Sequence, residues 1–570
     1  MKNREIANML YEIADYLEIK GVQFKPRAYR QAAQSVETLS EDIQDVYERE
    51  ELENIPRVGA SIASKIKEIL ETGHLKYLED LREERPEGLR ELMEIEDIGP
   101  KTALKLYKEL KISNIDELES AAKEGKIRDL EGFGEKIEEN ILENIKMYRS
   151  FHKRFILGFI LPDAQDIVKK LKNLEEVEKI SLAGSIRRKK ETIGDVDILI
   201  TSQNPSKVMD FFTKLPEVKR VIAKGKTKST IVVANNLHVD LRIIEKESFG
   251  AALQYFTGSK EHNIKLRKMA LDKNWKLSEY GLFKKENDKM IAGENEEEIY
   301  KTLEMNYIEP ELRENRGEIE AALKDELPRL IEYDEVKGDL HVHSTWSEGV
   351  HSIEEMAETA RPLGHEYIAI CDHAKTLQIA QGLTDEDLRK QIKEIEKINR
   401  KMDDFTILSG VEANIDSDGN VDVGNDVLKD LDVVVASVHS GLKQSEKKLT
   451  ERILTAMHND HVTVIGHPTG RLINERKPCE LDLSKAFEAA AELRVFMEIN
   501  AFPNRLDLSD ANCRKAKEYG VKLSLGSDAH SRDHLRYLEL GIATARRGWL
   551  EKENIINSLS LKELKKLLGS

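Results

Sequence analysis

The 570-residue sequence has few cysteines, few aromatic residues and no long apolar run. Cys371, Cys479 and Cys513 show no paired spacing, which fits a reducing compartment. No stretch approaches the roughly 20 apolar residues of a membrane span, so we expect no contact with a membrane. The N-terminus lacks a charged segment followed by an apolar core, so we expect no signal peptide and a cytoplasmic location.

Charged residues make up 34% of the chain, against 6% aromatic residues, and the mean hydropathy is −0.51. The length predicts three to five domains. A net charge of −17 argues against bulk affinity for nucleic acid, but residues 219–239 hold five Lys or Arg and no acid. Any nucleic-acid contact is therefore expected to be local.

Two carboxylates stand two residues apart in a β-forming run, Gly194 to Ile200. Residues two apart on a strand share a face, so Asp195 and Asp197 should lie side by side. A second alternating strand, residues 237–243, would place Asp240 beside them. Three carboxylates on neighbouring strands can hold two Mg²⁺ ions about 4 Å apart, the arrangement used for phosphoryl transfer.

A basic turn, Gly184-Ser185 with Arg188, comes just before these carboxylates. Its backbone N–H groups can approach an anion, and Arg188 adds a charge-assisted donor. An Asp-x-Asp pair alone would be compatible with an ordinary surface strand beside a basic loop. The combined spacing favours nucleotidyl transfer.

The first 150 residues contain three similar units of a helix, a glycine turn and a second helix. They cover residues 52–66, 92–103 and 127–137. The helix after Gly59 or Gly99 would aim unpaired N–H groups at a phosphate, so these helix-hairpin-helix units predict DNA binding without sequence readout. Lys65 has two interpretations: a phosphate-contacting lysine, or a nucleophile that attacks a sugar aldehyde as a Schiff base.

Residues 251–335 give weaker signals. Tyr255 to Ser259, with Asn263 and Arg267 at helical spacing, suits the wall of a site for a flat phosphorylated ligand, although a plain helix N-cap has the same pattern. Residues 285–298 are polar and predict an exposed loop. Residues 309–335 predict a helical linker.

The last 236 residues hold eleven of the fifteen histidines. Seven apolar runs end in metal-ligand residue types: 338–343, 368–373, 407–412, 433–439, 462–467, 495–500 and 523–530. Helical segments separate them, which predicts a parallel barrel with functional residues at the C-terminal strand ends. Buried structural histidines would explain one or two such ends. The series instead suits Zn²⁺ or Mn²⁺ and a metal-activated water.

Residues 1–316 resemble family X DNA polymerases, and residues from 335 onward resemble the PHP (polymerase and histidinol phosphatase) domain. The resemblance implies a multidomain α+β and α/β protein with helical helix-hairpin-helix domains, a nucleotidyltransferase palm and thumb, and a distorted (β/α)7 barrel. The expected boundaries are 1–85 (lyase-like), 86–150 (DNA-binding), 151–250 (palm), 251–316 (thumb), 317–334 (linker) and 335–570 (PHP).

The same resemblance implies roles for individual residues of the polymerase half. Asp195 and Asp197 would bind both Mg²⁺ ions (Mn²⁺ is an alternative), and Asp240 would activate the primer 3′-hydroxyl. Expected nucleotide contacts are Ser185, Arg188, Gly194, Tyr255, Phe256, Gly258, Asn263 and Arg267. Expected DNA contacts are Lys25, Tyr29, Gly59, Gly99 and, in the barrel, Arg471. Lys65 matches the lyase nucleophile.

In the PHP half the resemblance implies up to three ions, Zn²⁺ or Mn²⁺. One would take His341, His343, Glu412 and Asp528; a second Glu412, His439 and His467; a third Glu348, His373 and His530. The implied chemistry is hydrolysis at DNA 3′ ends: a 3′–5′ exonuclease, with 3′-phosphatase or abasic-site endonuclease activity as further options.

The sequence therefore predicts a monomeric gap-filling polymerase of base excision repair that uses dNTPs and gapped or primer-template DNA. One rival is a PHP phosphoesterase whose polymerase half only positions DNA. Another is a non-catalytic scaffold for DNA ends. The three intact aspartates argue against the first rival, and the seven strand ends with ligand residue types argue against the second.

Overall fold

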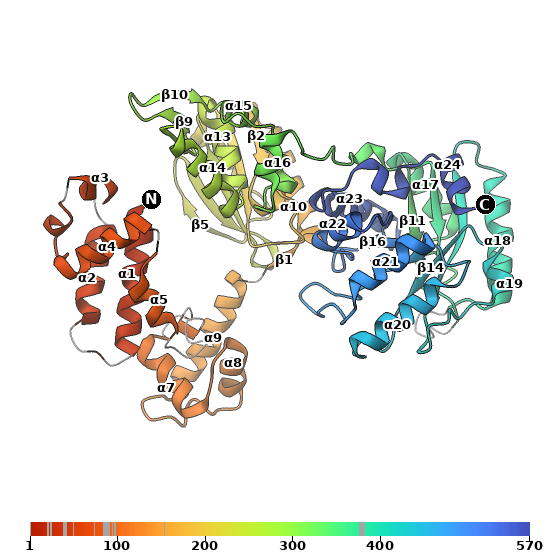
Figure 1. Cartoon of the computed structure of the whole chain (residues 1–570), viewed down its shortest axis with the longest axis horizontal. Coiled ribbons are helices and arrows are strands. Elements are labelled where there is room, and N and C mark those ends of the chain that lie inside the picture. The colour runs from red at the N-terminus through yellow and green to blue at the C-terminus, as the bar shows by residue number, and fades with distance from the viewer. Residues whose placement is uncertain are drawn as a thin grey trace. The chain divides into compact units, whose positions relative to one another are not determined.

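A computed structural model describes residues 2–569 except 20, 21, 23, 24, 38–42, 50, 73, 84–91, 94, 96, 97, 153 and 376–381. The chain forms two compact units, Met1–Lys153 and Arg154–Ser570, which are treated separately below (Figure 1). Among the described residues, no helix has the length and apolar character needed to cross a membrane.

The first unit is helical, as predicted. Its α-helices are α1 (Lys2–Ile19), α2 (Lys25–Glu37), α3 (Ile43–Glu48), α4 (Ala60–Thr72), α5 (Lys76–Glu83), α7 (Pro100–Leu110), α8 (Ile115–Lys123) and α9 (Glu135–His152). Helices α4, α7 and α9 each begin directly after a glycine, whose carbonyl accepts a backbone N–H of the first turn. One apolar cluster covers residues 6–81 and a second covers 92–145, so the unit has two cores.

The second unit begins with a five-stranded mixed sheet in the order β2-β4-β7-β6-β5. These strands are β2 (Val177–Leu182), β4 (Val196–Ser202), β5 (Arg220–Lys224), β6 (Lys228–Val232) and β7 (His238–Ile243). Strands β1 (Phe155–Ile156) and β3 (Thr192–Ile193) form a separate short pair, and helices α10 (Leu157–Lys172), α11 (Gly184–Arg187) and α12 (Pro205–Phe212) complete this region. Strands β4 and β7 are parallel neighbours, which fixes the relation of their carboxylates.

Residues 249–324 form a smaller α+β region. It contains α13 (Phe249–Thr257), α14 (Lys260–Asp272), β8 (Trp275–Ser278), β9 (Gly281–Lys284), β10 (Lys289–Ala292), α15 (Glu296–Thr302) and α16 (Glu318–Lys324). The predicted exposed loop at 285–298 is wrong, because this stretch forms β10 and the start of α15. The run of acids misled the prediction: Glu296 is buried, whereas Glu297 beside it is exposed.

Glu296 joins the two regions. One of its carboxylate oxygens accepts hydrogen bonds from Arg187 at 2.9 Å and from Arg313 at 2.5 Å, and the other accepts from Arg187 at 2.6 Å. Arg313 is fully buried. Burial opposes charge on Glu296, but Arg313 and Arg187 outweigh it and lower its pKa to about 2. The carboxylate therefore stays charged between the buried guanidinium of Arg313 and the half-buried guanidinium of Arg187.

The expected helical linker is only partly helical. Within 309–335, α16 covers residues 318–324, and the next segment is irregular. Glu318 at the start of α16 is fully buried and lies 2.7 Å from the Nδ1 atom of His262. The N-terminal part of this segment thus packs into the fold through a buried acid. The predicted linker did not include such a contact.

The C-terminal region is the predicted seven-stranded parallel barrel. The strands run in chain order: β11 (Gly338–Val342), β12 (Tyr367–Ile370), β13 (Thr406–Asn414), β14 (Val433–Ser437), β15 (Val464–Ile465), β16 (Phe496–Asn500) and β17 (Leu523–Gly526). A parallel bridge between Val342 and Ala529 brings the last segment back to the first strand, so the barrel is nearly closed.

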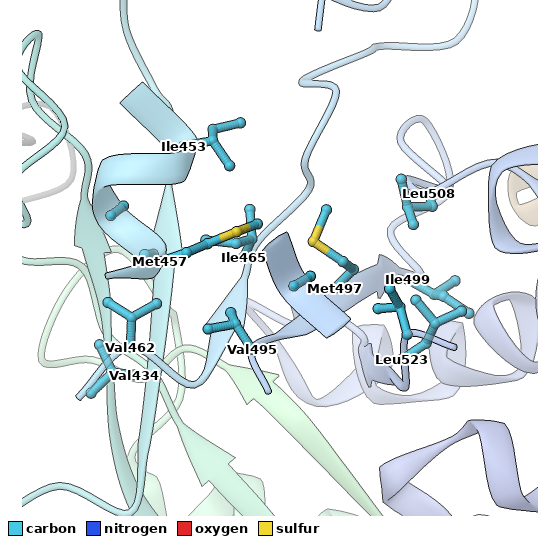
Figure 2. Packing of buried hydrophobic residues seen from close by; sticks show 14 of the residues in the cluster. Val434, Ile453, Met457, Val462, Ile465, Val495, Met497, Ile499, Leu508 and Leu523 are labelled. Carbon is cyan, nitrogen blue, oxygen red and sulfur yellow. The ribbon is translucent and has the colours of Figure 1, made fainter. Parts of the chain in front are cut away.

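Helical segments separate the barrel strands. The α-helices are α17 (Ile353–Ala360), α18 (Asp385–Asn399), α19 (Asn425–Leu428), α20 (Glu446–Met457), α21 (Leu483–Leu493), α22 (Asp510–Glu518), α23 (Leu538–Arg547) and α24 (Leu561–Leu568). Figure 2 shows one side of the resulting core, where Met457 of α20 lies beside Ile465 of β15, and Val462 lies beside Val434 of β14. Amphipathic helices and strand faces thus share a single apolar layer.

The barrel and the five-stranded region also share apolar core. Ile473, Leu506 and Leu540 of the barrel belong to the buried cluster around β4 and β7. At Gly158 of α10, a Cβ would stand 2.5 Å from a Leu540 methyl group and 2.8 Å from the Pro503 Cβ. Only glycine permits this close approach, so the two regions are tightly joined here.

We predict that Glu296→Ala lowers the free energy of unfolding by about 3–5 kcal/mol, because it leaves the buried Arg313 and the half-buried Arg187 without their shared partner. Glu297→Ala, on the same turn, should change stability by less than about 0.5 kcal/mol. Chemical denaturation would measure both.

The stabilisation by Glu296 should also depend on pH. Its folded-state pKa lies below the unfolded value of 4.5, so the contribution is fully present above about pH 4.5 and is lost as pH falls toward 2. A Glu296→Gln variant should lose less stability than the wild type over that interval. Equal acid dependence in the two proteins would contradict the assignment.

Candidate active sites

Three carboxylates meet where β4 and β7 begin. Asp197 and Asp240 are direct partners in the parallel register, and Asp195 immediately precedes β4. The Thr230 hydroxyl donates a hydrogen bond of 2.5 Å to Asp240, and the Lys228 ammonium lies 2.7 Å from its other oxygen. The alternating pattern thus brings the predicted trio together.

The electrostatics of this trio call for a cation. Burial, followed by the charges of Asp195 and Asp240, raises the pKa of Asp197 to about 7. Burial and Asp240 also raise the pKa of Asp195. Hard carboxylate oxygens that repel one another in this way suit divalent ions such as Mg²⁺.

The glycine turn lies against the same carboxylates. Gly184 has φ +64°, and a Cβ there would stand 2.9 Å from Asp197 Oδ2, so the position requires glycine. Ser185 follows and lines a cavity of about 330 Å³. A Cβ on Gly194 would lie 3.9 Å from the Arg154 guanidinium. The turn therefore faces both the carboxylates and a basic cavity.

Arg188 is placed by protein partners. Its Nε donates to Glu314 at 3.0 Å, and its Nη1 donates to the carbonyl of Thr257. Only 9% of the residue is exposed. A contact with nucleotide phosphate remains a prediction, since these bonds hold the guanidinium next to the turn but already use part of its donors.

The predicted nucleotide wall lies at the end of α13. The Tyr255 and Phe256 rings meet edge to face at 5.2 Å, and the Arg242 guanidinium lies 4.4 Å from the Phe256 ring centre. Asn263 donates to the Tyr255 carbonyl at 2.7 Å, and Arg267 Nε to the Asn263 carbonyl at 3.4 Å. The aromatic pair and the two polar residues are thus one connected group.

Gly258 adds a second required glycine. It has φ +73°, and a Cβ there would stand 3.1 Å from Arg188 Nη1. The Ser259 hydroxyl accepts the His262 N–H and so caps α14, as the N-cap alternative proposed. The motif therefore both caps a helix and brings the two predicted binding segments together.

The predicted lyase residues lie in the first unit. Lys65 Nζ is 3.2 Å from the Ser61 carbonyl and 4.9 Å from the Tyr77 ring centre. Tyr29 is buried, and burial followed by Tyr77 raises its pKa to about 12. Lys25 is exposed at the start of α2. A lysine beside an aromatic ring is compatible with both interpretations of Lys65.

Gly59 and Gly99 occupy the predicted helix starts. The Gly59 carbonyl accepts the N–H groups of Ile62 and Ala63 in α4, and Gly99 is the N-cap of α7. A Cβ at either glycine would meet no described atom within 4 Å. Both turns therefore leave room for a backbone phosphate to approach, although their contact with DNA remains a prediction.

Glu412 at the end of β13 is the centre of the barrel site. It is 1% exposed. Five imidazole nitrogens lie near its oxygens: His373 Nδ1 at 2.9 Å, His467 Nε2 at 2.9 Å, His439 Nε2 at 3.2 Å, His341 Nε2 at 3.5 Å and His343 Nε2 at 3.7 Å. One carboxylate thus connects ligand types from four other strand ends, since His341 and His343 both come from the end of β11.

Two further sets flank Glu412. His343 Nε2 lies 3.1 Å from Asp528 and 3.2 Å from His341 Nε2. Glu348 lies 2.7 Å from His373 and 2.9 Å from His530. Potential donor atoms fall within 4.8 Å of one another in three sets: His343, Glu348, His373 and His530; His341, His343 and Asp528; His373, Glu412 and His439. All the predicted PHP ligands therefore meet in one cluster.

The donor types of this cluster also suit a bound metal. Buried ring nitrogens of His343, His373 and His467 lack a hydrogen-bond partner among the described residues, and His373 Nδ1 has none although Glu412 is near. Burial opposes charge on His341, but Glu498 and Glu412 raise its pKa. Burial and His530 lower the pKa of His343 to about 3. Imidazoles and carboxylates gathered in this way are ligand types for Zn²⁺ or Mn²⁺.

Sequence reasoning missed the residues that orient these ligands. Glu498 is 1% exposed; it lies 2.6 Å from His341 Nδ1 and accepts the His467 backbone N–H at 2.6 Å. Asn500 donates to Asp528 at 3.1 Å. Their strand end, 495–500, was recognised as one of the seven. Glu498 and Asn500 could have been identified in the sequence by asking which polar side chains hydrogen-bond to the metal-ligand residues and so fix their orientation.

Arg471 stands apart from this cluster. Its Nη2 donates to Glu191 at 2.8 Å and to the Leu506 carbonyl, and its side chain is 11% exposed. These partners place it between the barrel and the five-stranded region. A DNA-phosphate contact by Arg471 stays a prediction.

We predict that Glu498→Gln weakens Mn²⁺ binding by about 10- to 100-fold, because an amide orients His341 less firmly than a carboxylate does. Glu492→Gln, a change of an exposed residue on α21, the helix that precedes β16, should leave Mn²⁺ binding unaltered. Calorimetric titration of the metal-free variants with Mn²⁺ would measure the two affinities. Equal affinity in the two variants would rule out the role assigned to Glu498.

Known families match both halves of the chain. The helix-hairpin-helix domain matches residues 1–75 and the SAM-like helix-hairpin-helix tandem residues 89–147. The DNA polymerase beta palm matches residues 163–265 and the DNA polymerase beta thumb residues 252–314. The PHP domain matches residues 339–502. These ranges cover the carboxylate trio and most of the histidine cluster.

Characterised relatives agree with these matches. The chain is 39% identical over 571 residues to the DNA polymerase/3'-5' exonuclease PolX of Bacillus subtilis, covering 100% of this chain and 99% of that protein. It is 31% identical over 248 residues to a probable phosphatase of Thermoanaerobacter sp., covering 40% of this chain and 96% of the relative. Similarity over the full length, together with matches to the polymerase beta and PHP domains, places the chain in the PolX family, the family X DNA polymerases that carry a C-terminal PHP domain.

Proposed function

We propose that this protein is a DNA polymerase that fills short gaps and trims DNA 3′ ends with its own 3′–5′ exonuclease. The observation that carries the proposal is the pairing of Asp197 with Asp240 in parallel register beside the Gly184 turn, in a chain similar to PolX over its whole length. This pairing and the full-length similarity support a working polymerase site and speak against a protein whose polymerase half only positions DNA.

In the polymerase site, Asp195 and Asp197 would hold two Mg²⁺ ions, with Mn²⁺ as a substitute. Such ions stabilise the charge that develops on the transferred phosphoryl group. Asp240 would take the proton of the primer 3′-hydroxyl, and its bond from Thr230 fixes the carboxylate for that role. Ser185 and the N–H groups of the turn would receive the dNTP phosphates.

In the barrel site, the three sets of ligands would hold up to three ions, Zn²⁺ or Mn²⁺. When bound, these ions supply an activated water for phosphodiester hydrolysis. Glu412 would hold an ion together with His373 and His439, and Glu498 and Asn500 would keep His341 and Asp528 in their ligand orientations. Relatives that match 34% to 40% of this chain are probable phosphatases, so removal of a 3′-phosphate is a second candidate reaction.

The proposal also covers the substrates of these reactions and the cellular role of the protein. Gapped or primer-template DNA fits the helix-hairpin-helix turns of the first unit, and dNTPs fit the wall formed by Tyr255 and Phe256. We infer a cytoplasmic monomer that acts in base excision repair. This inference rests on the composition and the motifs of the sequence.

We predict that the two sites can be inactivated independently, since their ligands lie in separate regions. Asp195→Ala should lower gap filling by several orders of magnitude while leaving 3′-end digestion largely intact. His341→Ala combined with His343→Ala should do the reverse. Primer extension and digestion of labelled DNA would measure both activities. Loss of both activities from either change, with circular dichroism unaltered, would mean a single shared site.

We also predict that borohydride traps the protein on DNA ending in a 5′-deoxyribose phosphate, because the Lys65 amine can form a Schiff base with the sugar aldehyde. Lys65→Ala should abolish the adduct, whereas Lys67→Ala, two residues further along the same helix, should keep it. No adduct with the wild type would favour the phosphate-contacting interpretation of Lys65.

A further inference from the structure

One arginine of the barrel reaches the polymerase site. Arg547 is the last residue of α23, and its side chain is only 5% exposed. Its Nη1 donates a hydrogen bond of 2.8 Å to the backbone carbonyl of Arg188 and lies 3.1 Å from Glu314. Its Nη2 donates to Asp510 at 2.8 Å. A PHP residue therefore holds the main chain of the nucleotide turn.

The same contacts organise the side chain of Arg188. Glu314 accepts from Arg188 Nε at 3.0 Å and from Arg547 at 3.1 Å, so the two arginines share one carboxylate. Burial opposes charge on Glu314, but Arg188 and Arg547 outweigh it and lower its pKa. Arg188 is thus fixed at its carbonyl by the barrel and at its guanidinium by Glu314 and Thr257.

The cavity of about 330 Å³ lies along this network. Its lining includes Ser185, Arg188 and Lys190 from the five-stranded region and Arg547 from the barrel. Arg316, also in the lining, pairs with Asp510 at 3.1 Å and so supports the anchor of Arg547. The turn expected to receive phosphate is therefore exposed on one side to a basic cavity whose opposite wall belongs to the PHP barrel.

We propose that Arg547 is a positioning residue of the polymerase: from the PHP barrel it holds the Gly184–Arg188 turn in the conformation that receives the dNTP phosphates. This inference rests on the proposed assignment of that turn to nucleotide binding. An arginine is required because one planar guanidinium reaches the Arg188 carbonyl, Glu314 and Asp510 together. A lysine ammonium at the same site cannot span all three acceptors in the same geometry.

The neighbouring arginine provides a matched control. Arg546 lies on the same helix and its side chain is also 5% exposed. It bonds Glu311 at 2.8 Å, the Ile331 carbonyl at 2.9 Å and Glu332 at 3.1 Å, and none of these residues belongs to the turn. Loss of Arg546 therefore weakens the attachment of the barrel without releasing the turn.

The test compares Arg547→Met with Arg546→Met in the full-length protein. We expect Arg547→Met to raise the KM for dNTP about tenfold, the effect of losing a charge-assisted hydrogen bond of roughly 1.4 kcal/mol, with kcat within about twofold of wild type. Arg546→Met should keep the wild-type KM. Both variants should retain 3′-end digestion, because neither arginine contacts the histidine cluster in the described residues. Steady-state extension of a gapped substrate would measure these constants.

Three results would overturn the proposal: an unchanged KM in Arg547→Met, an equal rise in Arg546→Met, or a fall in kcat alone. Should Arg547→Met fail to fold, Arg547→Lys carries the same test, with an expected rise in KM of about threefold because one bond of the set survives. Ser185→Ala separates this proposal from the assignment on which it rests. A raised KM in Ser185→Ala with an unchanged KM in Arg547→Met would leave the turn assigned and Arg547 without a role.

Discussion

Carboxylates that the fold holds close together need positive charge nearby, and this constraint governs both active sites of the protein. At β4 and β7 the parallel register leaves Asp195, Asp197 and Asp240 in one place, and burial and mutual repulsion raise the pKa of Asp197 to about 7. In the barrel, Glu412 is surrounded by histidines. Some buried ring nitrogens of these histidines have no hydrogen-bond partner among the described residues. Both arrangements become favourable when cations bind.

Ion pairs elsewhere in the second unit keep these groups in position. They are largely shielded from water. Glu296 between Arg187 and Arg313 joins the sheet to the α+β region. Arg547 joins the barrel to the nucleotide turn. These pairs are far apart in the chain, so each fixes a relation between regions that local structure leaves open.

Local regularities were predictable from the sequence. The alternation around Asp197 and Asp240 predicted two strands, and the repeated apolar runs predicted all seven strands of the barrel with ligands at their ends. Strand period and the direction of parallel strands determine which side chains meet, so the three aspartates and the ligand types at the strand ends were predictable from pattern alone. The grouping of the metal ligands came instead from the family resemblance.

Long-range partners were not predictable in this way. Glu296 looked like one of several solvated acids, because its partner Arg187 is 109 residues away. Glu498 lies 157 residues from His341, and Arg547 lies 359 residues from Arg188. No periodicity in the chain encodes such pairs. They follow from how the regions dock, which only a three-dimensional arrangement reveals.

The shared apolar core of the barrel and the sheet determines whether the two halves of the chain can be separated. Ile473, Leu506 and Leu540 fill the cluster around β4 and β7, so the boundary between the halves in sequence is not a boundary in packing. A protease that cuts the exposed segment 323–326 would leave two fragments held together by that apolar surface. Separate expression of the polymerase half would uncover the same surface, and the fragment should aggregate more readily than the intact chain.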